Sequence, residues 1–194
     1  ADKVGQFNEY GTPGGKYYVP GGFTFPILQF RNHRAELYGF DVSGRVKLSE
    51  TAELGRFDLS GVISYVHGKN LDTGDGLYFI MPLNARFSLD HRLGGWSSGI
   101  ELQLVDSKTH VAVVRNEFKT PSYALLNLRT SYEWDNLRLD LGIQNVADTR
   151  YFPPLGGFYY AGYKPNSYAN TTPLAYGPVP GPGRSYYAGV TLKF

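Results

Sequence analysis

Apolar and polar residues alternate one by one along most of this chain. Residues 137–144 read Leu-Arg-Leu-Asp-Leu-Gly-Ile-Gln, so every odd position is aliphatic and every even position is polar or Gly. Residues 83–93 and 96–105 repeat the pattern. A period of two places successive side chains on opposite faces of a β-strand. The sequence therefore predicts strands that have one apolar face and one polar face.

Seven segments carry this alternation, and no long segment shows the 3.6-residue apolar repeat of a helix. We assign residues 1–27 to an extracellular loop segment and residues 28–194 to the strands and their connections. The predicted strands are residues 28–48, 56–67, 82–93, 96–106, 122–134, 137–146 and 184–194.

The connections between these strands alternate in length. Three are short, and the other three are long and rich in Gly, Pro, Tyr and Asn. Short turns at one end and long loops at the other are typical of outer-membrane barrels, and a tilted strand of ~10 residues spans roughly the 25 Å apolar band of that membrane. The short connections are residues 49–55, 94–95 and 135–136, and the long ones are 68–81, 107–121 and 147–183.

These features favour an all-β fold, a transmembrane antiparallel β-barrel, over a soluble β-sandwich. A sandwich would bury one face of each sheet against the other sheet. Here the polar face carries many charges, among them Asp41, Arg86 and Glu101, which suit a wet lumen better than a packed interior. Aromatic residues are also expected in belts at both membrane interfaces. The candidates are Trp96 and Trp134 beside short turns, and Tyr38, Tyr65, Tyr123 and Tyr186 nearer the long loops.

Composition narrows the function classes. The 194 residues include 24 Gly, 16 Tyr and no Cys, with a net charge of +2. The lack of Cys excludes disulfides, thiolate metal sites and cysteine catalysis. The balanced charge, without a Lys/Arg block, argues against a nucleic-acid partner. No apolar run is long enough for a membrane-spanning helix.

The C-terminal strand ends in an aromatic residue with apolar residues at alternate positions before it. This pattern resembles the sorting signal that the outer-membrane assembly machinery reads. The expected signal residues are Tyr186, Val190, Leu192 and Phe194.

Three further segments resemble motifs of TonB-dependent receptors. Residues 143–151 resemble the family's "NLFDxxY" segment, with Val-Ala in place of Leu-Phe, and residues 181–189 resemble its "PGR-x-Y" segment. Residues 32–41 are similar to its "N-x-x-x-A-x-x-x-G-x-E" strand, with Asp41 in place of Glu. The motif positions are Asn145, Asp148, Tyr151, Gly183 and Arg184.

The resemblance covers residues 28–194 and implies the C-terminal third of a 22-stranded barrel that encloses a plug domain. It implies a receptor in the bacterial outer membrane that takes up a scarce nutrient, such as a ferric siderophore, cobalamin or a carbohydrate, with energy supplied through the TonB system. The implied partners are membrane lipid, the remaining strands and the plug (in the same longer chain or in a companion chain), the TonB complex indirectly, and the barrel assembly machinery.

Seven strands are too few to close such a barrel. Closed bacterial barrels have an even number of strands, eight or more, and an unpaired strand edge in lipid is costly. We therefore expect the first and last strands to pair with strands outside this sequence. An extra strand at residues 16–19, followed by Pro20, is the alternative that would close a small barrel.

The long loop 152–183 is the main candidate for ligand capture. Its aromatic side chains suit stacking on a flat or iron-chelating ligand or on a sugar, although packing of the loop on its neighbours explains them equally well. His110, in another long loop, is a further candidate ligand contact. The loop candidates are Tyr159, Tyr160, Tyr163, Tyr168 and Tyr176.

No segment predicts an enzyme. Residues 95–99 match G-x-S-x-G but form a hairpin turn, and the Asp-Thr-Gly triplet at residues 72–74 lacks the second carboxylate of an aspartic protease. The four His residues have no metal-ligand spacing, so we expect no metal site and no cofactor. The alternatives to transport are a structural barrel segment of a split receptor or surface complex, which anchors or seals, and a binding or adhesion module.

Overall fold

The computed structural model describes residues 2–8, 24–29, 31–115, 117–159 and 177–193. In chain order its elements are β1 (Asp2–Asn8), β2 (Thr24–Gln29), β3 (Ala35–Thr51), β4 (Gly55–Asn70), β5 (Asn84–Leu93), β6 (Trp96–Val105), the 3-10 helix η1 (Val113–Arg115), β7 (Tyr123–Glu133), β8 (Leu137–Gln144), β9 (Phe158–Tyr159), β10 (Gly177–Pro178) and β11 (Ser185–Leu192).

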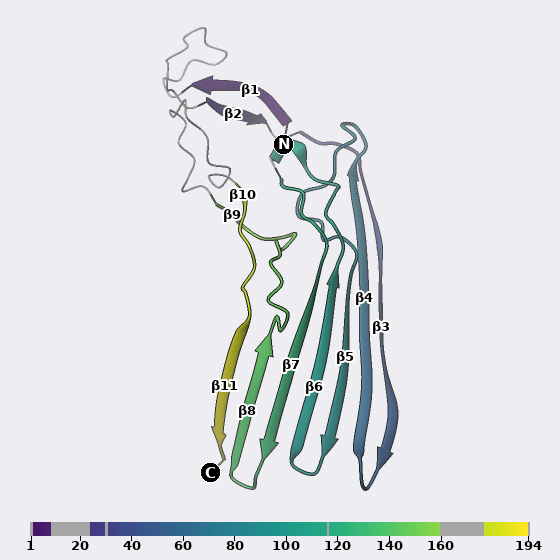
Figure 1. The fold of residues 1–194 in the computed structure, drawn as a ribbon. Coiled ribbons are helices and arrows are strands. Elements are labelled where there is room, and N and C mark those ends of the chain that lie inside the picture. The colour runs from purple at the N-terminus through teal and green to yellow at the C-terminus, as the bar shows by residue number, and fades with distance from the viewer. Residues whose placement is uncertain (1, 9–23, 30, 116, 160–176, 194) are drawn as a thin grey trace.

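One seven-stranded antiparallel sheet dominates the molecule (Figure 1). Its order, β11-β8-β7-β6-β5-β4-β3, follows the chain, so each strand lies beside its predecessor in the sheet. The short turns gather at one end of the sheet and the long connections at the other. The remaining strands of the described residues form two small two-stranded sheets, β1–β2 and β9–β10. The predicted all-β, seven-stranded antiparallel architecture is confirmed.

The register aligns side chains of one kind across the whole sheet. One row of directly paired residues is apolar from edge to edge, and the adjacent rows are mainly polar, because the pairings along these rows keep the two-residue alternation in phase. The β3–β4 ladder shifts its register only beyond these rows, between Lys47 and Ser49. The apolar row is Val46, Leu59, Leu89, Ile100, Leu128, Ile143 and Tyr186.

Most of these apolar side chains remain exposed. Ile100, in the middle of the central strand β6, is 48% exposed, and Val46 on the edge strand β3 is 53% exposed. The buried hydrophobic side chains of the described residues instead lie at or beyond the long-loop end of the strands: Val105, Val111, Ala112 and Leu125. An apolar sheet face without a protein layer over it is suited to contact with lipid.

The predicted bounds of the first strand and of the first short turn need correction. The first strand begins at Ala35 rather than at residue 28, because its ladder with β4 ends at the Ala35–Asn70 pair and residues 28 and 29 belong to β2. The first short turn covers only residues 52–54, because β3 and β4 pair almost to its tip.

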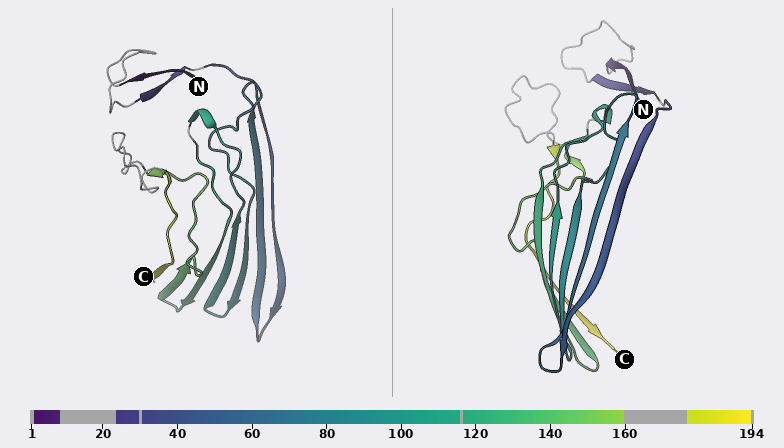
Figure 2. Two further views of the ribbon diagram at one scale, coloured as in Figure 1. Left: turned by 45° about the horizontal axis from the view of Figure 1, so that its top comes forward. Right: turned by 90° about the vertical axis from the view of Figure 1, so that its right-hand side faces the viewer.

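The strands differ in length, and this shapes the long-loop end. Strands β3 and β4 have 17 and 16 residues, whereas β5 and β6 have 10 each. Both long strands run on beyond their neighbours toward the loops, which Figure 2 shows from two sides. Among the described residues, no helix is long and apolar enough to cross a membrane.

Candidate functional site

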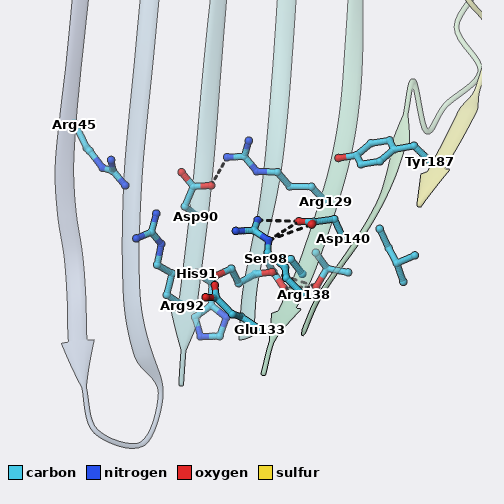
Figure 3. A pocket seen from close by; sticks show the side chains of 14 residues that line it. Arg45, Asp90, His91, Arg92, Ser98, Arg129, Glu133, Arg138, Asp140 and Tyr187 are labelled. Atoms are coloured by element: carbon cyan, nitrogen blue, oxygen red, sulfur yellow. Dashed lines mark hydrogen bonds and ion pairs between the residues drawn. The ribbon is translucent and has the colours of Figure 1, made fainter. Parts of the chain in front are cut away.

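The polar face of the sheet carries a dense set of charged side chains near the short-turn end. They surround a hollow of about 580 Å³ (Figure 3). Opposite charges pair there: Arg129 of β7 reaches across β6 to Asp90 of β5 at 2.6 Å, and within β8 Arg138 contacts Asp140 at 2.8 Å. The register places Glu133 opposite Arg138 and Ser131 opposite Asp140 beside the β7–β8 turn.

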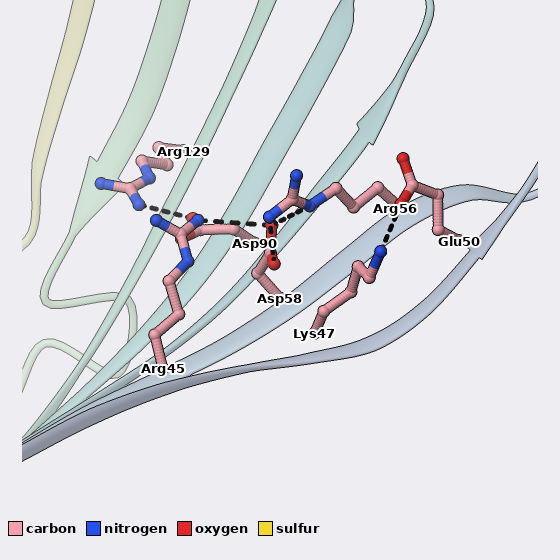
Figure 4. A network of polar contacts seen from close by, with 7 residues as sticks. All are labelled: Arg45, Lys47, Glu50, Arg56, Asp58, Asp90 and Arg129. Carbon is pink, nitrogen blue, oxygen red and sulfur yellow. Dashed lines mark hydrogen bonds and ion pairs between the residues drawn. The ribbon is translucent and has the colours of Figure 1, made fainter.

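Asp58 is the most completely buried side chain of this face, at 1% exposure. Two arginines cover it: Arg56 at 2.8 Å and 2.9 Å, and Arg45 at 3.3 Å (Figure 4). A carboxylate that loses its water needs such partners. Arg92 lies directly opposite Arg56 in the ladder, and among the described residues no carboxylate contacts it. This face therefore holds surplus positive charge at Arg92.

The apolar face has aromatic residues at both of its ends. At the short-turn end Tyr132 packs against Trp96 at 5.7 Å and against Trp134 at 4.5 Å. Polar atoms here are satisfied within the face, since the Trp96 indole N–H donates to Ser98 at 2.7 Å. At the other end Tyr38 and Tyr186 are 53% and 70% exposed. The two Trp residues, Tyr38 and Tyr186 stay candidates for the two interfacial belts expected from the sequence.

Asn145 connects two of the sequence motifs in space. Asn145 is 3% exposed, and its backbone adopts a positive φ of 51°. Its amide nitrogen donates to the carbonyls of Thr149 and Pro182, at 2.9 Å and 3.3 Å, and its oxygen accepts the Thr149 N–H at 2.8 Å. An Asn tolerates the left-handed conformation better than most residues and can bond its own turn.

Asp148 and Tyr151 complete this contact. The Asp148 carboxylate accepts the Arg184 backbone N–H at 2.8 Å, next to Gly183. The Tyr151 ring lies where any side chain at Gly181 would stand, and its carbonyl accepts the Gly181 N–H at 2.9 Å. The motif residues Asn145, Asp148, Tyr151, Gly183 and Arg184 thus come together as one clamp, in which Arg184 takes part through its backbone.

A buried ion pair, which the sequence did not reveal, joins the long loops. Lys108 and Glu117 are 2% and 4% exposed in their side chains and lie 2.5 Å apart. The Glu117 carboxylate also accepts the backbone N–H of Phe79, and Lys108 also donates to the carbonyl of Pro154. Three long connections therefore meet at this pair, the loop hub. Both residues lie in irregular segments, where no periodicity indicates burial.

The loop at residues 71–83 is anchored to the start of β3 by Asp72. Its carboxylate accepts the Arg34 backbone N–H at 2.9 Å and contacts the Arg34 guanidinium and the His33 ring. These bonds, the backbone N–H of Arg34 first, hold the pKa of Asp72 below its usual value. The Asn70 side chain caps the turn by accepting the Asp72 and Thr73 N–H groups. These contacts support the interpretation of the segment as a turn.

The structure places few of the candidate ligand residues. His110 is exposed in its loop, and its ring contacts the ring of His67 at 5.3 Å. Tyr159 is described only by its backbone in β9. Tyr160, Tyr163, Tyr168 and Tyr176 lie outside the described residues.

The assembly-signal residues are placed in part. Tyr186, Val190 and Leu192 project from β11 with 59–70% exposure, and Phe194 lies outside the described residues. Lys193 ties this end to the β7–β8 turn by contacting the Glu133 carboxylate and donating its backbone N–H to Asn136.

Comparison with known proteins identifies the architecture. The family model "TonB dependent receptor-like, beta-barrel" matches residues 6–146. Among solved structures, the copper transporter OprC is similar at a TM-score of 0.71 and 26% sequence identity, over 92% of this chain and 26% of that protein. The chain thus spans about a quarter of the length of this relative. No curated protein matches the chain.

Proposed function

Because the chain belongs to the TonB-dependent receptor-like β-barrel family, we propose that it forms part of the wall of an outer-membrane active-transport receptor. The observation that carries this proposal is the sheet with one exposed apolar face and one charged face. The apolar face contacts lipid, and the charged face lines the lumen. The long loops, joined at the loop hub, face the outside of the cell and offer surface for ligand capture.

The lumenal face fits a protein partner, the plug domain, because its charges are numerous and mostly paired. A polar surface of this kind can form hydrogen bonds and ion pairs with a second polar surface without a large desolvation penalty. Arg92 has no carboxylate partner among the described residues, so an acidic side chain of the plug would bind there. The plug, the strands that complete the barrel and the TonB complex would supply the energised step.

The two outer strands of the sheet need further partners. The outward edges of β3 and β11 carry no ladder within the described chain. Lipid cannot satisfy backbone N–H and C=O groups, and each such group left unpaired costs several kcal/mol. Strands of the same longer polypeptide, or of a companion chain, would pair with both edges. Assembly into the outer membrane would use the signal that ends at Phe194.

The cargo is proposed as a scarce nutrient: a ferric siderophore, cobalamin, a carbohydrate or, by analogy with the similar transporter, copper. Uptake of each labelled compound would be measured in cells that carry the complete receptor, with and without an active TonB system. Energy-dependent uptake of one compound supports the transport function.

A variant that lacks residues 155–180 tests the role of the loop. Loss of ligand binding with normal assembly supports capture by this loop. Normal assembly of the complete receptor with no energy-dependent uptake of any compound would favour the alternative, a barrel segment that anchors or seals.

A further inference from the structure

A small cavity opens at the long-loop end, where β4 outruns its neighbour. The ladder between β4 and β5 ends at the Ser64–Asn84 pair, but β4 continues to Asn70. Residues 65–68 of β4 line a cavity of about 210 Å³ there, together with residues 80–83 and 106–110. The cavity is separate from the charged hollow of the lumenal face.

Two imidazole rings meet at this cavity. The rings of His67 and His110 lie 5.3 Å apart between centroids, at 73° to one another. The Tyr38 ring of β3 packs on the His67 ring, with 5.0 Å between the ring centroids. The ring of His67 makes no hydrogen bond within the described part of the chain, and His110 has only a 3.3 Å contact with the Thr109 hydroxyl. Both rings therefore keep nitrogen atoms available for a ligand.

The other donor groups of the cavity suit a metal ion. Met81 and Asp106 line it together with the two His residues. The Asp106 carboxylate already accepts the Ser107 N–H at 2.6 Å through one oxygen, so its second oxygen is available. No group of three His, Cys, Asp or Glu side chains in the described residues is arranged around one point. The two imidazoles are thus the core of the site, and a thioether or carboxylate would move to complete it.

The two rings are close enough to share one metal ion. A metal–nitrogen bond of ~2.0 Å puts an imidazole centroid about 3.2 Å from the ion, and a tetrahedral angle between two such rings then separates their centroids by about 5.2 Å. The observed separation is 5.3 Å. Because the rings now meet edge to face, binding requires one ring to turn into the cavity so that the two nitrogens converge.

We propose that His67 and His110 bind a divalent transition-metal ion at the outer rim of the barrel wall, with Met81 or Asp106 as a further ligand. Imidazole and thioether donors favour copper over hard ions such as Mg²⁺ or Ca²⁺, and copper is also the strongest binder of the divalent series. The site does not depend on the transport function, since it is built within the wall and its loops. The spacing of His residues in the sequence could not reveal this site, because His67 lies near the end of β4 and His110 lies in a distant loop.

Copper titration of the purified, complete receptor in detergent, followed by electron paramagnetic resonance, tests the proposal. The wild-type protein is expected to bind Cu²⁺ with the hyperfine pattern of two nitrogen ligands, and Zn²⁺ is expected to compete. His67→Asn and His110→Asn should each weaken Cu²⁺ binding by at least about 10-fold, because even the outer partners of metal ligands have effects of that size.

His91→Asn is the matched control. The His91 ring stacks on Phe57 at 4.4 Å and contacts the Leu54 carbonyl at 2.8 Å, far along β5 from the cavity. This variant should bind Cu²⁺ as the wild type does. Equal affinity in all three variants would overturn the proposal. A wild-type spectrum with fewer than two nitrogen ligands would also overturn the proposal. This second test needs no variant, so it holds even if a variant fails to assemble.

Discussion

Replacement of Asn145 by Ala tests the clamp that joins the ends of β8 and β11. The substitution removes three hydrogen bonds of a side chain that is 3% exposed, to Thr149 twice and to Pro182 once. It leaves partly buried backbone groups unpaired, at ~1–3 kcal/mol for such a group. It also forces Ala into a positive φ of 51°, at ~1–2 kcal/mol. The free energy of unfolding should therefore fall by about 2–5 kcal/mol.

Two further variants separate the causes. Asn145→Gly loses the same hydrogen bonds but accepts the positive φ, so it should be less damaging than Ala by about 1 kcal/mol. Asn145→Asp keeps the acceptor for the Thr149 N–H but loses both donated bonds. Urea unfolding of the complete receptor in lipid vesicles measures these differences, because the midpoint shifts with stability at constant slope. An Ala variant within about 0.5 kcal/mol of the wild type would refute the reasoning, since that is the range of ordinary surface substitutions.

Three other substitutions examine other parts of the account. Ile100→Arg, at the centre of the apolar row, should lower stability in vesicles by ~2–4 kcal/mol, and an effect below about 0.5 kcal/mol would reverse the assignment of the lipid face. Lys108→Met leaves Glu117 buried without its partner and should speed proteolysis of the long loops, with strand hydrogen exchange unchanged; unaltered loop cleavage would show that the hub does not hold them. Asp72 has a lowered pKa, so its contacts with Arg34 stabilise the loop above its unfolded pKa of ~3.9 and are lost as the pH falls through the folded value. The protection factors of the backbone amides in that loop, which compare the exchange rate with that of an unfolded peptide at the same pH, should therefore fall in acid in the wild type. In Asp72→Asn they should already be lower at neutral pH and should depend less on pH.

The strands were predictable because their information is local. Alternation with a period of two fixes which residues share a face, and short turns fix which strands pair. The pairing of Glu133 with Arg138 followed from the position of the turn alone, and the register confirms it. The start of β3 was predicted too early, because the apolar residues Leu28 and Phe30 were counted into the strand across the polar run at residues 31–34. The ladder ends at Ala35 because the partner strand ends at Asn70 and Asp72 binds the next backbone N–H.

The loops were less accessible to sequence reasoning. The motif residues around Asn145 and Arg184 could be identified by resemblance, but their mutual contacts depend on two distant segments meeting at the ends of β8 and β11. The hub of Lys108 and Glu117 and the contact of His67 with His110 depend on loop paths that no pattern encodes. Burial of a lysine in a loop follows from tertiary packing and has no signature in the residue order.

The central claim is that this sheet is one part of the wall of a larger plugged barrel. Native mass spectrometry of the species extracted from the outer membrane measures it most directly. We expect this 21.6 kDa chain to be part of a larger polypeptide, or to form a stable complex with a second polypeptide that supplies further strands and a plug. A monomer of 21.6 kDa, folded and resistant to protease without any partner, would contradict it.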